Sequence, residues 1–263
     1  MLLAIDIGNS NVTLGVFEND KLKATFRLAT DTRRMPDEYG PALLDLLPLR
    51  GVAPEGISAI AMCSVVPPLT GVFQDLAQSY FHLSPLVVGP GVRTGIKVLY
   101  DNPRDVGADR IVDAVAAFRL YGGPVVIVDF GTATVFDAIS AQGEYLGGAI
   151  APGVNMAAEA LYTNTSQLRR VELVAPSTAI GRNTTHAMQA GVVLGHVDMV
   201  EGMVRRFQRE LGGEARVVAT GGLAPLIARQ TTVFHKVNVE LTLHGLRMIY
   251  ESNMVPGEGG GHQ

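Results

Sequence analysis

The apolar positions of the first thirty residues form short β-rich runs separated by polar turns. The runs are Leu2 to Ile7, Val12 to Phe17 and Lys21 to Leu28, with Gly8 to Asn11 and Glu18 to Asp20 between them. Short apolar runs bounded by Gly, Asn, Ser and Asp are typical of strands joined by tight turns. The pattern therefore predicts an antiparallel meander at the start of the chain.

Helical spacing and strand-like runs alternate over the rest of the chain, which predicts a mixed α/β fold. Apolar residues recur with helical spacing in segments 36–47, 67–80, 108–120, 154–161, 184–211 and 241–250. Strand-like runs occupy segments 57–63, 124–129, 132–139, 145–150 and 215–219. The helical stretch 184–211 carries an apolar stripe that suits either a core or a dimer surface. The stripe consists of Met188, Val192, Val193, Val197, Val200 and Val204.

Two distant segments repeat one strand–turn–strand pattern. Residues 4–12 read AIDIGNSNV and residues 127–135 read IVDFGTATV. Each has two apolar residues, Asp, an apolar residue and Gly, followed by a short polar, a small and a second short polar residue and then Val. A single turn of this kind is ordinary hairpin punctuation. Two copies in comparable places indicate an internal duplication.

The residues of the two repeated turns suit phosphate binding. Gly8 with Asn9, Ser10 and Asn11, and Gly131 with its neighbouring threonines, offer backbone N–H groups and short donors without a bulky side chain in the way. Asp6 and Asp129 stand at the ends of apolar strands, where a carboxylate needs a partner such as a cation. The repeat therefore predicts two phosphate loops with a cation beside them.

A third glycine turn, Gly221-Gly222, follows an apolar strand and precedes a short helix. Alone it is an ordinary strand-to-helix turn, but after two phosphate loops it suits a backbone lying against a base or ribose. Other nucleotide motifs are missing. None of the four lysines follows a glycine, so there is no P-loop, and Gly89-Pro90-Gly91 has no third glycine at dinucleotide spacing.

Composition narrows the function classes. The 263 residues carry a formal net charge of −4 with scattered basic residues, so we do not expect a nucleic-acid partner. The single cysteine, Cys63, lies in an apolar run and predicts a packed structural thiol. The start of the chain has neither a basic leader nor a long apolar stretch, so we expect a cytoplasmic protein without membrane insertion. The glycine-rich segment 255–263 predicts a flexible tail.

Two phosphate loops followed by a late Gly-Gly turn resemble the sequence plan of the actin-like, hexokinase-like ATPase superfamily. Within it, Gly107-Ala108-Asp109-Arg110 resembles the Gly-x-Asp-Arg signature of the type III pantothenate kinase family. The family's two phosphate motifs match residues 6–11 and 129–132, and the resemblance covers nearly the whole chain. It implies a duplicated ribonuclease-H-like α/β fold, with two similar mixed-sheet halves, residues 1–115 and 116–254, around a nucleotide cleft.

The resemblance implies ATP-dependent phosphorylation of pantothenate to 4'-phosphopantothenate, the first step of coenzyme A biosynthesis. Asp109 would be the catalytic base, and its place at a helix start is expected to favour its ionised form. The implied ATP-binding residues are Asp6, Ile7, Gly8, Asn9, Ser10, Asn11, Val12, Thr13, Thr132, Gly221 and Gly222. The implied substrate-binding residues are Tyr100, Gly107, Ala108, Asp109, Arg110 and Thr184.

Cations and a second subunit are also implied by the resemblance. Asp6 and Thr132 would accompany ATP and its Mg²⁺, and Asp129 would hold a monovalent cation, K⁺ or NH₄⁺. A homodimer is expected, with Thr184 reaching pantothenate from the partner subunit.

Alternatives remain at both the residue and the function level. Asp101 and Asp105 are rivals for the base, but solvated turn residues are common in such Asn-Pro segments. His186 and His196 lack a third ligand at metal spacing and are expected on helix surfaces or in ordinary hydrogen bonds. The chain could instead be a non-catalytic regulatory relative of the same fold, or a kinase for another small hydroxylated substrate. A substrate panel separates these possibilities.

Overall fold

The computed structural model describes residues 1–254, which form two compact units. The first unit contains Met1–Gly95, Asn102–Ala116 and the described residues from Thr242 onward, and the second contains Ile96–Asp101 and Ala117–Leu241. Both units are therefore discontinuous in sequence, whereas the sequence suggested one cut after residue 115. The predicted tail 255–263 lies outside the described residues.

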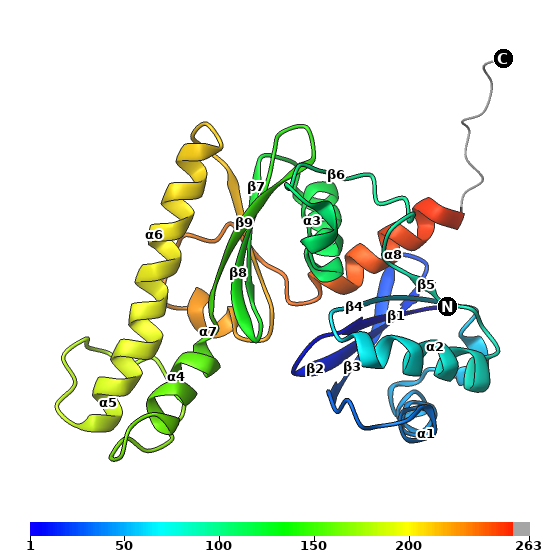
Figure 1. The fold of residues 1–263 in the computed structure, drawn as a ribbon, viewed down its shortest axis with the longest axis horizontal. Coiled ribbons are helices and arrows are strands. Elements are labelled where there is room, and N and C mark those ends of the chain that lie inside the picture. The colour runs from blue at the N-terminus through cyan, green and yellow to red at the C-terminus, as the bar shows by residue number, and fades with distance from the viewer. Residues whose placement is uncertain (255–263) are drawn as a thin grey trace. The chain divides into compact units, whose positions relative to one another are not determined.

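The first unit is built on a five-stranded sheet (Figure 1). Its strands are β1 (Leu2–Ile7), β2 (Asn11–Glu18), β3 (Lys21–Ala29), β4 (Ala59–Ser64) and β5 (Leu86–Val87), in the order β3-β2-β1-β4-β5. β1, β2 and β3 pair antiparallel, which confirms the predicted meander, whereas β4 pairs parallel to β1 and to β5. The buried central strand β1 thus has an antiparallel neighbour on one side and a parallel one on the other.

Helices complete the first unit. They are α1 (Pro36–Leu46), α2 (Pro67–Phe81), the first nine residues of α3 (Ala108–Tyr121) and most of α8 (Leu241–Met254), with 3₁₀ turns at Pro48–Arg50, Pro54–Gly56 and Pro103–Asp105. α1 and α2 pack their buried residues against the sheet core. Close packing of α8 depends on Gly245, because a Cβ there would lie 2.2 Å from the carbonyl oxygen of Val112 in α3.

The second unit repeats the strand arrangement of the first. Its six strands are β6 (Lys97–Val98), β7 (Val125–Phe130), β8 (Ala133–Ile139), β9 (Glu144–Pro152), β10 (Arg216–Thr220) and β11 (Lys236–Val237), in the order β11-β10-β7-β8-β9-β6. β7 pairs antiparallel with β8 and parallel with β10, as β1 does with β2 and β4. The predicted duplicated ribonuclease-H-like fold is therefore confirmed, with β6 as an added edge strand.

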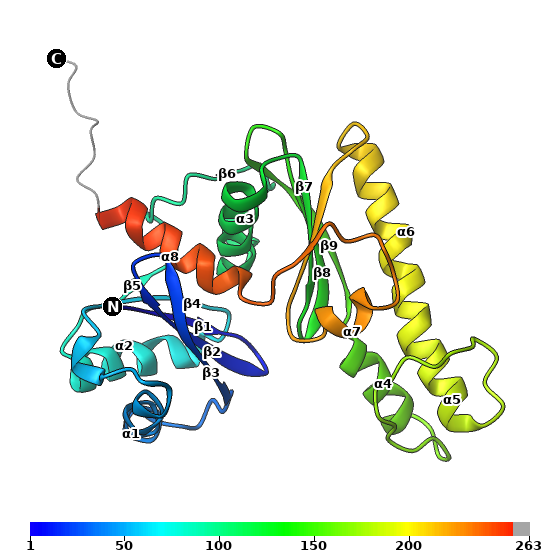
Figure 2. The same cartoon turned by 180° about the vertical axis from the view of Figure 1, so that it is seen from behind.

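The helices of the second unit are α4 (Val154–Thr163), α5 (Thr184–Gln189), α6 (Gly195–Glu210) and α7 (Ala224–Ala228), together with a π-helical turn, η4 (Ala190–Leu194). The predicted helix 184–211 is thus one helical path whose hydrogen-bonding pattern changes at η4. All six residues of its apolar stripe are buried, and α6 runs beside the sheet (Figure 2), so the stripe belongs to the core. None of the helices within residues 1–254 is long and apolar enough to cross a membrane.

Candidate active site

A half-buried carboxylate and a buried thiol lie side by side at the end of β1. The strand register places Asp6 opposite Cys63 of β4, and the Cys63 Sγ donates a hydrogen bond to Asp6 Oδ1 at 3.5 Å. Burial, and then the charges of Asp6 and Asp109, raise the pKa of the Cys63 thiol well above its ordinary value. The thiol therefore stays protonated and serves as a donor, a role beyond the packing that the sequence predicted.

Asp6 lies where a negative charge is costly. Burial first, and the Asp109 carboxylate second, raise the pKa of Asp6 to about 7, against a smaller lowering by the hydrogen bond from Cys63. Asp6 and Asp109, which are about a hundred residues apart in sequence, thus share one electrostatic environment. A bound cation would relieve both the burial cost and the repulsion, so this carboxylate fits a place beside a metal ion.

Asp109 is held at the first turn of α3. The backbone N–H of Arg110 donates to Asp109 Oδ1 at 2.8 Å. A Cβ at Gly107 would lie 2.5 Å from the same oxygen, so glycine at that position leaves room for the carboxylate. Burial raises the pKa of Asp109, and the hydrogen bond and charge of Arg110 offset this only in part. The backbone hydrogen bonds at the helix start lower the pKa of Asp109, as expected, but burial outweighs them and the net direction is upward.

The first repeated turn links β1 to β2. The N–H of Gly8 donates to the Asn11 carbonyl at 3.0 Å, and Asn9, Ser10 and Asn11 are exposed. Ile7 and Val12 on either side have fully buried side chains, so only their backbones could face a ligand. The remaining predicted residue, Thr13, is the strand partner of Asp6.

The two rival aspartates lie in exposed turns. Asp105 accepts a hydrogen bond from the Asn102 side chain at 2.8 Å, within the 3₁₀ turn that precedes α3. Asp101 is exposed just before this turn. Both fit the interpretation as solvated turn residues, in contrast to Asp109.

In the second unit, Asp129 occupies on β7 the place that Asp6 has on β1. It pairs with Val135 of β8 and Thr220 of β10. Gly221 has a φ of +87°, and a Cβ there would lie 2.3 Å from Asp129 Oδ1. The predicted third glycine turn therefore packs directly on this carboxylate. Any larger side chain at position 221 would occupy the space beside the Asp129 oxygens, which we call the Asp129 cradle.

The second repeated turn lies against the start of α4. The N–H of Gly131 donates to the Ala133 carbonyl at 3.1 Å. A Cβ at Gly153 would lie 2.2 Å from the Thr132 carbonyl oxygen, so the glycine before α4 allows the turn to approach the helix. Gly222, the other residue of the glycine pair, stands next to Gly221 in the loop after β10.

Sequence reasoning gave His196 no specific partner, and the structure supplies one. Its Nε2 lies 2.8 Å from the hydroxyl of Thr134, which follows the second turn, and both side chains are buried. Burial lowers the pKa of His196, so the imidazole is neutral near pH 7. His186 lies in an exposed first helical turn, where Asn183 caps its backbone N–H. Both histidines therefore match the prediction of ordinary hydrogen bonds or surface positions.

Tyr100 rests on residues that the sequence did not single out. Its ring is 6.4 Å from that of Tyr145, whose hydroxyl donates to Asp137 at 2.7 Å in the buried interior of the second unit. Gly147 lies beside the Tyr100 ring with a φ of +127°, a backbone conformation that favours glycine. The residues that support the Tyr100 ring therefore lie on strands β8 and β9. No sequence motif identifies them as part of the site.

The predicted site residues divide between the two units. Asp6 to Thr13 and Gly107 to Arg110 belong to the first unit, which brings Asp6 and Asp109 together with Cys63. The second unit contains Tyr100, Asp129, Thr132, Thr184, Gly221 and Gly222. Within it, Asp129 and Gly221 are in direct contact, while Thr184 is an exposed residue at the start of α5.

The duplicated sheets, each with an aspartate near the end of its central strand and a glycine turn after it, define a protein of the actin-like, sugar-kinase-like class. Solved structures share this fold. A Campylobacter jejuni protein described as a Baf family transcriptional activator matches with a TM-score of 0.63 at 20% identity, covering 95% of this chain and 98% of its own. A Sinorhizobium meliloti protein described as a 2-dehydro-3-deoxygalactonokinase matches with a TM-score of 0.55 at 14% identity, covering 100% of both chains.

Within this class the chain belongs to the type III pantothenate kinase family. The family model described as Type III pantothenate kinase matches residues 2–206. The Type III pantothenate kinase of Myxococcus xanthus is 53% identical over 253 residues, which cover 96% of this chain and 99% of that protein. The family resemblance carried by the residues 107–110 is thereby confirmed.

Proposed function

We propose that this chain transfers the γ-phosphate of ATP to the primary hydroxyl of pantothenate, which forms 4'-phosphopantothenate and ADP in the first step of coenzyme A biosynthesis. The observation that carries the proposal is the full-length similarity to a Type III pantothenate kinase, combined with a half-buried aspartate held by a helix start. Phosphoryl transfer needs mainly positioning and charge neutralisation, and this chain offers loops and carboxylates for both.

Asp109 would take the proton from the attacking hydroxyl. Its raised pKa makes the carboxylate a stronger base than an exposed aspartate, while the N–H of Arg110 keeps one oxygen oriented. The guanidinium of Arg110 would bind the pantothenate carboxylate through charge-assisted hydrogen bonds. Tyr100 and the backbone of Gly107 and Ala108 would shape the rest of the substrate site.

The two repeated turns would receive the ATP phosphates, and Gly221 and Gly222 would lie against the adenosine. The small residues of these turns, and the exposure of Asn9, Ser10 and Asn11, support these assignments. Asn9, Ser10 and Asn11 would contribute from the first unit, and Thr132 from the second.

Asp6 and Asp129 would help to bind the cations. Residues 1–254 contain no group of three or more His, Cys, Asp or Glu side chains arranged for a metal ion, so phosphates, water or backbone would supply the other ligands. Asp6 fits Mg²⁺ beside ATP, and the Asp129 cradle fits K⁺ or NH₄⁺. The chemistry that such cations supply is neutralisation of phosphate charge.

Replacing K⁺ by Na⁺ is expected to lower the rate if Asp129 holds a monovalent ion. The smaller ion fits the same ligands less well. Initial rates of ADP release in matched chloride salts measure this, and equal rates in both salts would remove Asp129 from the cation site.

We also propose that the chain works as a cytoplasmic homodimer. Several large apolar side chains of the second unit are exposed, among them Leu146, Ile150, Met156, Tyr162 and Ile180, with Ile150 67% and Ile180 84% exposed. Leu146 and Ile150 both fall on exposed positions of β9, where exposed and less exposed residues alternate. Exposed apolar surface of this kind favours a protein partner, and a second copy could also bring Thr184 to the substrate.

A non-catalytic regulatory role is the second candidate. It is favoured by one observation, the shared fold with the protein described as a transcriptional activator, which at 20% identity concerns the fold alone. Retention of Asp6, Asp109, Arg110, Asp129 and Thr132 favours catalysis.

A substrate panel tests the proposed function. ADP release is measured with ATP, Mg²⁺ and K⁺ in the presence of pantothenate or of small sugars, and the product is identified by mass spectrometry. Pantothenate-dependent release is expected. Release with a sugar but not with pantothenate would indicate a different kinase. Absence of ADP release with every acceptor tested, from protein shown to be folded, would favour the regulatory role.

A further inference from the structure

Thr30, the first residue after β3, holds two carbonyl groups of the first repeated turn. Its hydroxyl donates to the Gly8 carbonyl at 2.6 Å, and its backbone N–H donates to the Ser10 carbonyl at 3.1 Å. The second contact extends the β2–β3 ladder, whereas the first is a side-chain contact that no ladder requires. One residue therefore fixes the turn at two points.

These two contacts determine where the turn directs its N–H groups. A trans peptide is planar, so its N–H points away from its C=O. Because the Gly8 and Ser10 carbonyls point at Thr30, the N–H groups of Asn9 and Asn11 point to the opposite side. Backbone N–H groups that face outward from a turn can donate hydrogen bonds to an anion such as a phosphate.

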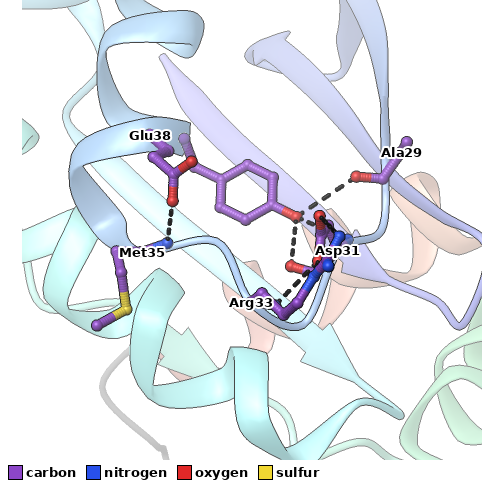
Figure 3. Close-up of polar contacts among 6 residues, drawn as sticks. Ala29, Asp31, Arg33, Met35 and Glu38 are labelled. Atoms are coloured by element: carbon purple, nitrogen blue, oxygen red, sulfur yellow. Dashed lines mark hydrogen bonds and ion pairs between the residues drawn. The ribbon is translucent and has the colours of Figure 1, made fainter.

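Thr30 is itself held in place by Tyr39 of α1. The phenol is fully buried and its ring packs 4.9 Å from that of Phe73. Its hydroxyl accepts a hydrogen bond from the N–H of Asp31 at 3.1 Å and lies 3.4 Å from the carbonyl of Ala29, so it contacts the residues on both sides of Thr30 (Figure 3).

The loop that follows is closed by its own contacts. Arg33 donates to the Asp31 carboxylate at 3.1 Å, and the Glu38 side chain accepts from the N–H of Met35 at 2.9 Å at the start of α1 (Figure 3). The segment between β3 and α1 is thus anchored at its helical end by the buried ring of Tyr39 and at its strand end by the sheet.

We propose that Thr30 is a positioning residue for ATP, which orients the peptide groups of the first turn toward the phosphates without touching the nucleotide, and that Tyr39 holds Thr30 in register. This inference rests on the proposed function, since it takes the Gly8–Asn11 turn as a phosphate loop. It adds a residue pair outside the motif, contributed by a different part of the first unit. Preorganised N–H donors need no rearrangement when the anion arrives.

The test compares Thr30→Val, Thr30→Ser and Thr25→Val with the wild type. Valine keeps the branched shape and the backbone hydrogen bond of Thr30 and removes only the hydroxyl, while serine retains it. Thr25 is an exposed residue of β3, the strand that Thr30 directly follows, so Thr25→Val is a matched control. Steady-state constants for ATP and for pantothenate, the dissociation constant of ATP and the unfolding temperature are measured for each protein.

Loss of one neutral hydrogen bond is expected to lower kcat/KM for ATP about 3- to 10-fold in Thr30→Val. The KM for pantothenate should stay within about twofold of the wild-type value, because Thr30 is proposed to act on the ATP site alone. Thr30→Ser should recover most of the loss, and Thr25→Val should match the wild type. Tyr39→Phe, which removes the hydroxyl and keeps the ring, should show a smaller change in the same direction.

Wild-type ATP constants in Thr30→Val would overturn the inference, and so would equal losses in Thr30→Ser or Thr25→Val. If Thr30→Val does not fold, the ATP constants of Thr30→Ser and Tyr39→Phe test the inference instead. Wild-type ATP constants in Tyr39→Phe would then count against it. Failure of the proposed function shows differently, as wild-type protein that does not phosphorylate pantothenate. In that case the ATP dissociation constants still test Thr30.

Discussion

Asp6 and Asp109 show how burial sets the chemistry of single residues in this protein. Each carboxylate is partly removed from water and has a raised pKa, and each accepts a hydrogen bond, from Cys63 for Asp6 and from the Arg110 N–H for Asp109. An uncompensated buried carboxylate costs stability. The cost is tolerable where a bound cation supplies the missing positive charge.

The raised pKa of Asp6 predicts a pH-dependent stability. Folding raises this pKa from 3.8 to about 7, so the folded state binds the proton more tightly than the unfolded state. The resulting stabilisation is complete below pH 3.8 and is lost as the pH rises through about 7. Asp6→Asn has no such titration. Between about pH 5 and 8 the wild type should therefore lose on the order of 3 kcal/mol more than the variant.

Denaturant unfolding of both proteins without nucleotide or divalent ions measures this difference. Cys63→Ala in the wild-type background serves as a control, because it removes the donor and leaves the carboxylate. Parallel stability curves for wild type and Asp6→Asn would show that Asp6 does not titrate in this range.

Site residues that lie in local motifs could be identified from the sequence, whereas the residues that contact them in space could not. Asp6, Asp109 and Asp129 were predicted because each sits in a short pattern with glycine. The contact between Asp6 and Cys63 depends on the register of β1 against β4, and the contact between Tyr145 and Asp137 on strand pairing. A local sequence pattern does not determine how β1 pairs with β4 or how β8 pairs with β9, so these partners were missed.

At the scale of elements, the helical path from α5 to α6 is the main support of the second sheet. Val200 and Val204 of α6 are fully buried in the core of the second unit, together with Val126 and Val128 of β7. The sequence predicted a helix with an apolar stripe but could not say what covers the stripe. It also gave no sign of η4, since a π turn depends on one extra residue per turn rather than on composition.

Val200→Ala is expected to destabilise the protein by about 2 kcal/mol, because the cavity left in a close-packed core is not refilled. Arg206→Ala, an exposed change on the same helix, should change the stability by less than about 0.5 kcal/mol. Chemical denaturation of both variants gives the comparison. A Val200→Ala protein as stable as the Arg206→Ala protein would place the stripe outside the core.

Long elements were predicted well and very short ones were not. The predicted helices, and the predicted strands that correspond to β1–β3 and β7–β9, lie close to the observed bounds, because each shows several periods of its pattern. β5, β6 and β11 have two residues each, which is too short to show a period. These edge strands form because a neighbouring strand offers hydrogen bonds, a tertiary effect.

For the whole molecule, duplication organises the chain. The repeated sequence pattern predicted two similar halves, and the sheets around β1 and β7 share one topology. The assignment of α8 to the first unit could not be predicted, since the segment from Thr242 is separated from that unit's strands by more than a hundred residues of sequence. Packing of Gly245 on α3 and of Leu243 beside Gly15 determines it.

The proposed homodimer gives a prediction at this scale. Ile150→Asp puts a charge on an exposed apolar strand face, which should weaken association through β9 and shift the protein toward the monomer. Leu49→Asp, at a residue 77% exposed in the first unit, is the control and should leave the oligomeric state unchanged. Light scattering over a range of concentrations measures both. Dimers of equal stability in both variants would place the interface elsewhere.

The most direct test of the account is ADP release from ATP by wild-type, Asp109→Asn and Asp105→Asn proteins, with and without pantothenate. Asp105 is an exposed aspartate close in sequence, so its variant controls for loss of one charge. We expect pantothenate-dependent release by the wild type and by Asp105→Asn, and a loss of at least about 100-fold in Asp109→Asn with ATP affinity retained. Full activity of Asp109→Asn, or equal loss of its ATP affinity, would contradict the assignment of the base. No pantothenate-dependent release by folded wild-type protein would contradict the proposed function itself.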